Sequence, residues 1–344
     1  MKWACPALLS LLSGFGTAHA AQPQVKITPL GSHAGEYCAT DRAMLFEDPT
    51  GVRVLYDAGA SVAGATDARL GAVHVVLLSH AHGDHIGSTK ISAPNAGSCA
   101  RPETVTALPA TNTGEIIAAK NAVIMTSAEM TNFLARKAET VRGSAIDNCA
   151  ESGLSRVTTV PTAAPCRAGV QVGGKRTFRL SGQDQGVEVT VVYAVHSNNL
   201  ARAMLAETGR TPLASDDLVA YAGHAAGYML RFSNGLKIYL SGDTTISSDM
   251  KTIIGDFYRP QLVVLNLGGT TMPSEEAAYA VNTLLHPAAV IPSHSSEEAT
   301  QGGRLKADSR TADFARLVKR SKVYLPLSGK TMSFDGKGRC RDGC

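Results

Sequence analysis

The segment Ser79-His80-Ala81-His82-Gly83-Asp84-His85 constrains this chain more than any other stretch. It directly follows the apolar run 73–78, which has the length and composition of a buried strand. Three imidazoles and a carboxylate this close together stay under-solvated unless a cation gathers them. Mixed histidine and aspartate ligands are typical of hydrolytic sites for divalent ions. The pattern therefore predicts a metal site at the end of this strand, rather than a polar loop with a chance cluster of histidines.

The first twenty residues have the pattern of a secretory signal peptide. Lys2 gives a positive start, residues 4–15 are mostly apolar, and Ala18-His19-Ala20 has the form of a cleavage site. The apolar stretch is too short to be a spanning helix. We expect an exported product, periplasmic or secreted after cleavage near Ala20, with no stable membrane insertion.

The remaining residues, 21–344, are long for one domain, but sandwich folds of this size occur as single units. The formal charge of +4 falls by one when Lys2 is removed, and the charges are evenly spread. Such a charge gives no reason to expect binding to nucleic acid or to an anionic membrane surface. We expect a small-molecule substrate, and the sequence leaves the oligomeric state open.

Six cysteines remain after removal of the leader, and an even number in an exported protein favours disulfides. They are Cys38, Cys99, Cys149, Cys166, Cys340 and Cys344. We expect Cys149 to pair with Cys166, and the last two either to pair locally or to tie the tail to the body. The weakly patterned stretch 91–185 is predicted to be a disulfide-braced insertion in a single domain.

Local signals predict two further elements. Strands 228–232 and 236–240 form a hairpin around Ser233-Asn234-Gly235, because Asn-Gly favours tight hairpin turns. A helix is predicted from Ser274 to Leu285, with Ser274 as its cap and two glutamates in its first turn.

Three more candidate ligands follow apolar runs. His196 follows the run 187–195, Asp243 follows 236–240, and His294 follows 288–291. Ligands gather at the carboxyl ends of strands in open α/β folds, so residues far apart in sequence can converge there. The full candidate set is His80, His82, Asp84, His85, His196, Asp243 and His294. This set is large enough for two divalent ions, for which we expect zinc, with manganese or iron as alternatives.

The chain resembles the metallo-β-lactamase superfamily, whose signature His-x-His-x-Asp-His matches residues 80–85. Further motifs resemble the branch that includes ascorbate-6-phosphate lactonase, over most of residues 25–295 except 91–185. These motifs are Ala194-Val195-His196-Ser197, Tyr221-Ala222-Gly223, Gly227-Tyr228-Met229-Leu230, Ile238-Tyr239-Leu240-Ser241-Gly242-Asp243-Thr244, Gly268-Gly269 with Thr271-Met272, Glu276-Ala277-Ala278 and Ile291-Pro292-Ser293-His294. The resemblance implies an α/β fold of the αββα sandwich type, in which helices flank two mixed β-sheets.

The resemblance also implies roles for the candidates. One metal would be held by His80, His82 and His196. The other would be held by Asp84, His85 and His294, with Asp243 bridging both. A bridging hydroxide would be the nucleophile, and Asp84 would accept its proton and return it to the leaving group.

Two residues have alternative interpretations. Asp57 either ends a strand as a turn residue or, as in the superfamily, lies beneath the metal site and orients a ligand. His224 has the spacing to Asp243 of the histidine in Gly-His-Thr-Pro-Gly of glyoxalase II-like members, where it would replace His196 as a ligand. We prefer His196 because of its strand context. His224 is then predicted to face the pocket as a substrate or acid–base residue, or to be simply exposed.

The resemblance favours a metal-dependent hydrolase that acts on an ester, lactone or phosphodiester bond. A β-lactam hydrolase is one alternative, although the β-lactamases of this fold lack an aspartate equivalent to Asp243. A non-catalytic binding module is another, although such a member would be expected to lose ligands. The segment 200–223, with Arg202 and Arg210, is interpreted as a substrate-facing loop.

Overall fold

The computed structural model describes residues 1, 23–153, 156–200, 204 and 219–344. The expected signal peptide, with its cleavage near Ala20, lies outside the described residues, as do Arg202 and Arg210. No helix in the described ranges is long and apolar enough to cross a membrane.

Two mixed sheets of eight strands each form the centre of the described structure. The first sheet has the order β22-β21-β1-β2-β3-β4-β7-β9 and consists of β1 (Val25–Pro29), β2 (Met44–Glu47), β3 (Arg53–Tyr56), β4 (Val75–Leu77), β7 (Val123–Met125), β9 (Cys166–Arg167), β21 (Met332–Phe334) and β22 (Cys340–Asp342). Its strands run antiparallel from β22 to β3 and parallel from β3 to β9.

The second sheet has the order β20-β17-β16-β15-β14-β11-β10-β8. It consists of β8 (Val157–Val160), β10 (Lys175–Leu180), β11 (Val187–Tyr193), β14 (Ala226–Arg231), β15 (Lys237–Leu240), β16 (Leu262–Asn266), β17 (Ala289–Ser293) and β20 (Lys322–Val323). Three small pairs lie outside these sheets: β5 (Thr89–Ile91) with β6 (Thr104–Thr106), β12 (Asn199–Leu200) with β13 (Ala220–Tyr221), and β18 (Thr300–Gln301) with β19 (Arg304–Leu305).

Alternating side chains place apolar residues on both faces of each sheet. On β4, Val75 and Leu77 join the core between the sheets, whereas Val76 joins the core on the outer face. On β16, Val264 points between the sheets and Val263 points outward. A strand that is buried on both faces reads as a continuous apolar run, which is how these segments appear in the sequence.

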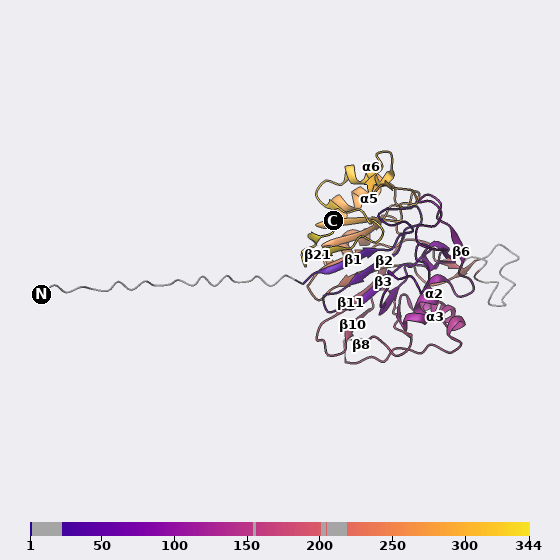
Figure 1. Ribbon diagram of the computed structural model, residues 1–344. Coiled ribbons are helices and arrows are strands. Elements are labelled where there is room, and N and C mark those ends of the chain that lie inside the picture. Colours follow the sequence, from indigo (N-terminus) through magenta and orange to yellow (C-terminus); the bar gives the residue numbers. More distant parts are fainter. Residues whose placement is uncertain (2–22, 154–155, 201–203, 205–218) are drawn as a thin grey trace.

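Helices cover the two outer faces. The pair α2 (Asn112–Lys120) and α3 (Ala128–Arg142) packs on the first sheet. The second sheet is covered by η2 (Met250–Tyr258), α5 (Ser274–Tyr279), η3 (Ala280–Leu285) and α6 (Arg310–Leu317). Figure 1 shows α2 and α3 on one side of the strands and α5 and α6 on another. The predicted αββα sandwich is confirmed.

The stretch 91–185 contributes to the sandwich itself. It carries the expected disulfide Cys149–Cys166, and the other pairs are Cys38–Cys99 and Cys340–Cys344. However, it also supplies β7 and β9 to the first sheet, β8 and β10 to the second, and both helices of one outer face. The description as an insertion is therefore too simple. Its strands have two to six residues, too few to give a clear periodic signal.

The two predicted local elements both form, but the predicted helix cap does not. The hairpin is confirmed, because β14 and β15 pair antiparallel around the Asn234-Gly235 turn. The helix is confirmed as well, because α5 and η3 together cover Ser274 to Leu285. Its predicted cap is wrong, because Pro273 occupies the cap position and the Ser274 hydroxyl donates to the carbonyl of Arg310 instead.

Candidate metal centre

The seven candidate ligands meet at one rim of the sandwich, where four strands end. The loop after β4 and the four-residue helix α1 (Gly83–Ile86) carry the His80–His85 motif. The segments after β11, β15 and β17 carry the other three candidates, His196, Asp243 and His294. A backbone hydrogen bond of 2.7 Å from Ala226 to Ser79 joins the two sheets at this rim. Ligand atoms of the seven residues form three overlapping groups, each within 4.8 Å.

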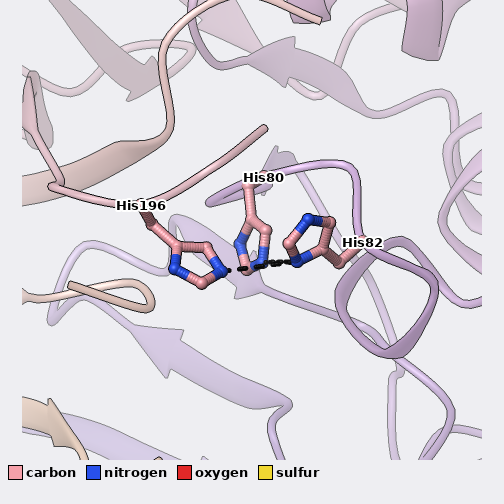
Figure 2. A group of neighbouring side chains, drawn as sticks. All are labelled: His80, His82 and His196. Atoms are coloured by element: carbon pink, nitrogen blue, oxygen red, sulfur yellow. Dashed lines mark hydrogen bonds between the residues drawn. The ribbon is translucent and has the colours of Figure 1, made fainter. Parts of the chain in front are cut away.

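Three histidines form the first group, and Figure 2 shows their rings turned toward one another. His82 Nδ1 lies 3.0 Å from His80 Nε2 and 3.3 Å from His196 Nε2. Burial lowers the pKa of all three imidazoles, most strongly that of His80. Neutral imidazoles whose ring nitrogens converge on one point are suited to hold a divalent cation.

The second group consists of Asp84, His85 and His294, beside Asp243. His294 Nε2 lies 3.2 Å from Asp84 Oδ2 and 3.0 Å from Asp243 Oδ2. His85 Nε2 lies 3.6 Å and 3.4 Å from the same two oxygens. Asp243 also forms a group with His80 and His85, so its carboxylate lies between the two clusters. This is the position that a bridging ligand requires.

Two buried atoms in this centre test whether the residues fit a metal. His85 Nε2 and Asp243 Oδ1 have no hydrogen-bond partner among the described residues. Leaving a buried polar atom unpaired costs about 1–3 kcal/mol, so such atoms usually have a ligand or water. A cation between the clusters would satisfy both atoms, and the donor set therefore fits a divalent ion.

The charges at the centre lead to the same conclusion. Burial lowers the pKa of His85, but the carboxylates of Asp243, Asp57 and Asp84 outweigh this effect and raise the pKa to about 10. Burial raises the pKa of Asp243, but His85 and His294 hold it well below its usual range. Three carboxylates therefore favour positive charge at this position, and a bound cation would supply it.

A second layer of contacts orients the rings. Asp57 Oδ2 lies 2.8 Å from His85 Nδ1 and accepts a hydrogen bond of 2.7 Å from the Ser79 hydroxyl. The same hydroxyl lies 2.9 Å from His80 Nδ1. Because the Nδ1 atoms are occupied, the Nε2 atoms of His80 and His85 face the centre. Asp57 is therefore a contact residue of a candidate ligand and more than a turn residue.

Sequence reasoning missed two residues that contact the motif. The buried Arg42 donates to Asp84 Oδ2 from Nε and Nη2, at 3.3 Å each. Asn198 accepts a 2.8 Å hydrogen bond from the Ala81 amide and donates to the carbonyl of Gly223 at 3.0 Å. Asn198 lies two positions after His196, which is a weak signal, whereas Arg42 belongs to no motif.

His224 lies outside all three groups. Its ring is exposed, its Nδ1 lies 3.1 Å from the Tyr221 hydroxyl, and its centroid lies 5.6 Å from that of Tyr193. Among the described residues, the structure places His196 rather than His224 with His80 and His82.

The fold and this rim of histidines and aspartates define a class of protein. Residues 39–294 match the family model described as "Beta-lactamase superfamily domain". The match covers most of the chain, and the chain belongs to this superfamily. The resemblance to the superfamily found in the sequence is confirmed.

Two curated relatives are named "UPF0173 metal-dependent hydrolase". One, from Polynucleobacter asymbioticus, is 37% identical over 153 residues, which are 43% of this chain and 48% of the relative. The other, from Cupriavidus taiwanensis, is 29% identical over 226 residues, which are 65% of this chain and 59% of the relative. The chain thus spans about half the length of the curated relatives it matches.

Two solved structures share the fold. Igni18, a metallo hydrolase from Ignicoccus hospitalis, is 20% identical with a TM-score of 0.54, over 91% of this chain and 99% of its own. YhfI from Bacillus subtilis, a metallo-beta-lactamase fold protein, is 13% identical with a TM-score of 0.51, over 90% and 99% of the two chains. At these identities the similarity establishes the fold alone.

Proposed function

We propose that this protein is an exported metal-dependent hydrolase that cleaves an ester, lactone or phosphodiester bond of a small molecule. The observation that carries the proposal is the convergence of seven ligand side chains, with two buried ligand atoms that lack partners among the described residues. The names of the two curated relatives support hydrolysis with a metal.

In this proposal, His80, His82 and His196 would hold one divalent ion, and Asp84, His85 and His294 would hold the other. Asp243 would be the ligand shared by the two ions. Zinc suits this donor set, and manganese or iron are alternatives. When bound, two such ions polarise a substrate oxygen and lower the pKa of water.

Asp84 is the proposed proton carrier. It is the most exposed of the seven residues, with 47% of its side chain accessible, so both water and substrate can reach it. Burial raises its pKa, but His85, His294 and Arg42 lower it far below the usual range. The low pKa keeps Asp84 ionised, so a carboxylate is available at the site to accept a proton from water and to return it to the leaving group. His224, exposed beside Tyr221, is proposed to contact the substrate or assist with acid–base chemistry.

Export is supported by the three disulfides, because such bonds persist in oxidising compartments. Expression of the full chain with an intact-mass measurement on the exported fraction would test this part. A product that begins near Ala21 is the expected result, and an uncleaved protein retained in the cytoplasm would contradict it.

The hydrolase is tested by metal content and activity together. We expect about two equivalents of metal per chain by plasma mass spectrometry, as in other two-metal sites. We also expect chelator-sensitive hydrolysis in a screen of lactones, phosphodiesters and a chromogenic β-lactam. The Asp243→Ala variant should stay folded and lose its turnover, because the shared ligand is missing. Near-normal activity in this variant would reject the two-metal assignment. A wild-type protein that retains no metal after metal-replete preparation would instead indicate a non-catalytic binding module.

A further inference from the structure

Arg42 is a buried cation in direct contact with the most exposed candidate ligand. Its side chain is 6% exposed, whereas that of Asp84 is 47% exposed. Both Nε and Nη2 of Arg42 lie 3.3 Å from the same oxygen, Asp84 Oδ2. This is the oxygen that lies 3.2 Å from His294 Nε2 and 3.6 Å from His85 Nε2. The guanidinium thus contacts the atom that faces the second ligand cluster.

The loop that carries Arg42 holds its guanidinium in place. Nη1 donates to the carbonyls of Ala39 and Asp41, at 3.1 and 3.3 Å. The Asp41 carboxylate accepts hydrogen bonds from the amides of Ser32 and Cys38, at 2.8 and 2.9 Å. The disulfide to Cys99 then ties the start of this loop to a distant part of the chain. Arg42 is therefore oriented independently of Asp84.

Asp84 needs such support. It lies on the four-residue helix α1, and its exposed carboxylate could rotate into water. Asp243 contacts the same nitrogen of His85 as Asp84 does, and Asp57 contacts the other nitrogen, so two further carboxylates lie nearby and would repel it. A rigid guanidinium that is already paired elsewhere loses little entropy when it holds a carboxylate.

We propose that Arg42 is a positioning residue that presents Asp84 Oδ2 to the pair His85 and His294, and so sets the affinity of the ion bound there. The inference rests on the metal-binding role proposed above. Arg42 itself is too buried to contact a substrate. Its positive charge opposes a cation nearby, so the proposal requires that the orientation of Asp84 outweighs this repulsion. The experiment measures whether Arg42 increases or decreases the affinity for this ion.

The experiment is a titration of the metal-free full chain with Zn²⁺ against a chromophoric chelator, which resolves the affinities of the two ions. In Arg42→Gln, we expect the affinity for the ion held by Asp84, His85 and His294 to fall about 10–100-fold, as when other residues that orient metal ligands are replaced. The affinity for the ion held by the three histidines should stay within about twofold. Arg42→Lys keeps the positive charge but not the planar guanidinium, so its affinity for the ion held by Asp84 should lie between those of the wild type and Arg42→Gln.

Arg69→Gln is the matched control. Arg69 is partly buried, and like Arg42 it pairs with a carboxylate, that of Asp67, and donates to backbone carbonyls, those of Gly31 and Ser61. It contacts none of the seven candidate ligands in the described structure. Its replacement should leave both affinities unchanged. Thermal unfolding of every variant would show whether a loss of affinity reflects a loss of fold.

A double-mutant cycle separates positioning from a general structural effect. If Arg42 acts through Asp84, then Arg42→Gln should change the affinity little when Asp84 is already replaced in Asp84→Asn. Equal losses in the two backgrounds, or a loss at both ions, would overturn the proposal. Unchanged or tighter binding in folded Arg42→Gln would also overturn it. A wild-type chain that binds no Zn²⁺ would reject the proposed function and this inference with it, whereas the other adverse results would reject this inference alone.

Discussion

The carboxylate of Asp57 lies 2.8 Å from Nδ1 of His85, although the two residues are 28 positions apart. Both side chains are buried, and the Ser79 amide and hydroxyl also donate to Asp57 at 2.7 Å each. Asp57 has a positive φ of 42°, a conformation that few residues other than glycine, asparagine and aspartate adopt readily. The fold thus keeps a carboxylate where it fixes the ring of a candidate ligand.

Asp57→Asn should weaken metal binding about 10–100-fold while the protein stays folded. Asparagine tolerates the backbone conformation, so the variant removes the charge beneath His85 without adding strain. Chelator competition and thermal unfolding would measure the two effects separately. Unchanged metal affinity would show that the contact with His85 is only structural.

Replacement of His196 and His224 should distinguish the two candidate third ligands. His196→Ala is expected to lose about one metal equivalent, because three histidines converge on one point and two hold an ion poorly. His224→Ala should keep its metal and reduce turnover only, since its ring contacts Tyr193 and Tyr221 rather than the ligand group. Plasma mass spectrometry on both variants checks this. Loss of an equivalent in His224→Ala would mean that the ligand assignment is wrong.

Removal of metal should destabilise the protein. An ion that binds only the folded state stabilises it by about 2.7 kcal/mol when its concentration is a hundred times its dissociation constant. Removal also leaves His85 Nε2 and Asp243 Oδ1 without partners among the described residues. Calorimetry with and without chelator should therefore show a lower unfolding temperature without metal, restored by added Zn²⁺. Identical unfolding temperatures would contradict the proposed centre.

The stability of the protein should depend on pH through Asp335 in the C-terminal segment. Its carboxylate accepts hydrogen bonds from the amides of Lys337 and Arg339 and from the side chains of Arg339 and Arg341. Burial raises its pKa, but these contacts outweigh burial and lower the pKa to about 2. Because the folded pKa lies below the unfolded value of 3.8, this stabilisation is present above pH 3.8 and is lost as the pH falls through about 2.

Asp335→Asn should therefore lose roughly 1.5–3 kcal/mol at neutral pH, the usual value of hydrogen bonds to a charged group. Its stability should change less between pH 4 and pH 2 than that of the wild type. Denaturant unfolding at several pH values measures both quantities. Asp342→Asn, at an exposed position of β22, is the control, and its stability should depend on pH as that of the wild type does. An acid response of Asp335→Asn equal to that of the wild type would exclude this carboxylate as its source.

The sequence by itself determined the local part of the candidate centre. Four candidate ligands lie within residues 80–85, so their proximity follows from covalent distance. His196, Asp243 and His294 were found because each follows an apolar run, and the sheets bring the ends of such strands to one rim. The αββα sandwich could be predicted from the same apolar runs, since a continuous apolar run marks a strand that is buried on both faces.

Only the tertiary structure decided which distant side chains complete the centre. The contact of Arg42 with Asp84 spans 42 positions, and no periodic pattern or motif marks it. The placement of His196 rather than His224 beside His80 depends on how β11 and β14 pair, and a shift in register would change it. Residues 91–185 contribute short strands to both sheets. The Ser274 hydroxyl donates to the carbonyl of Arg310 and so does not cap its helix. These contacts form between segments far apart in the chain, where the packing of whole elements outweighs the local preferences that a sequence reveals.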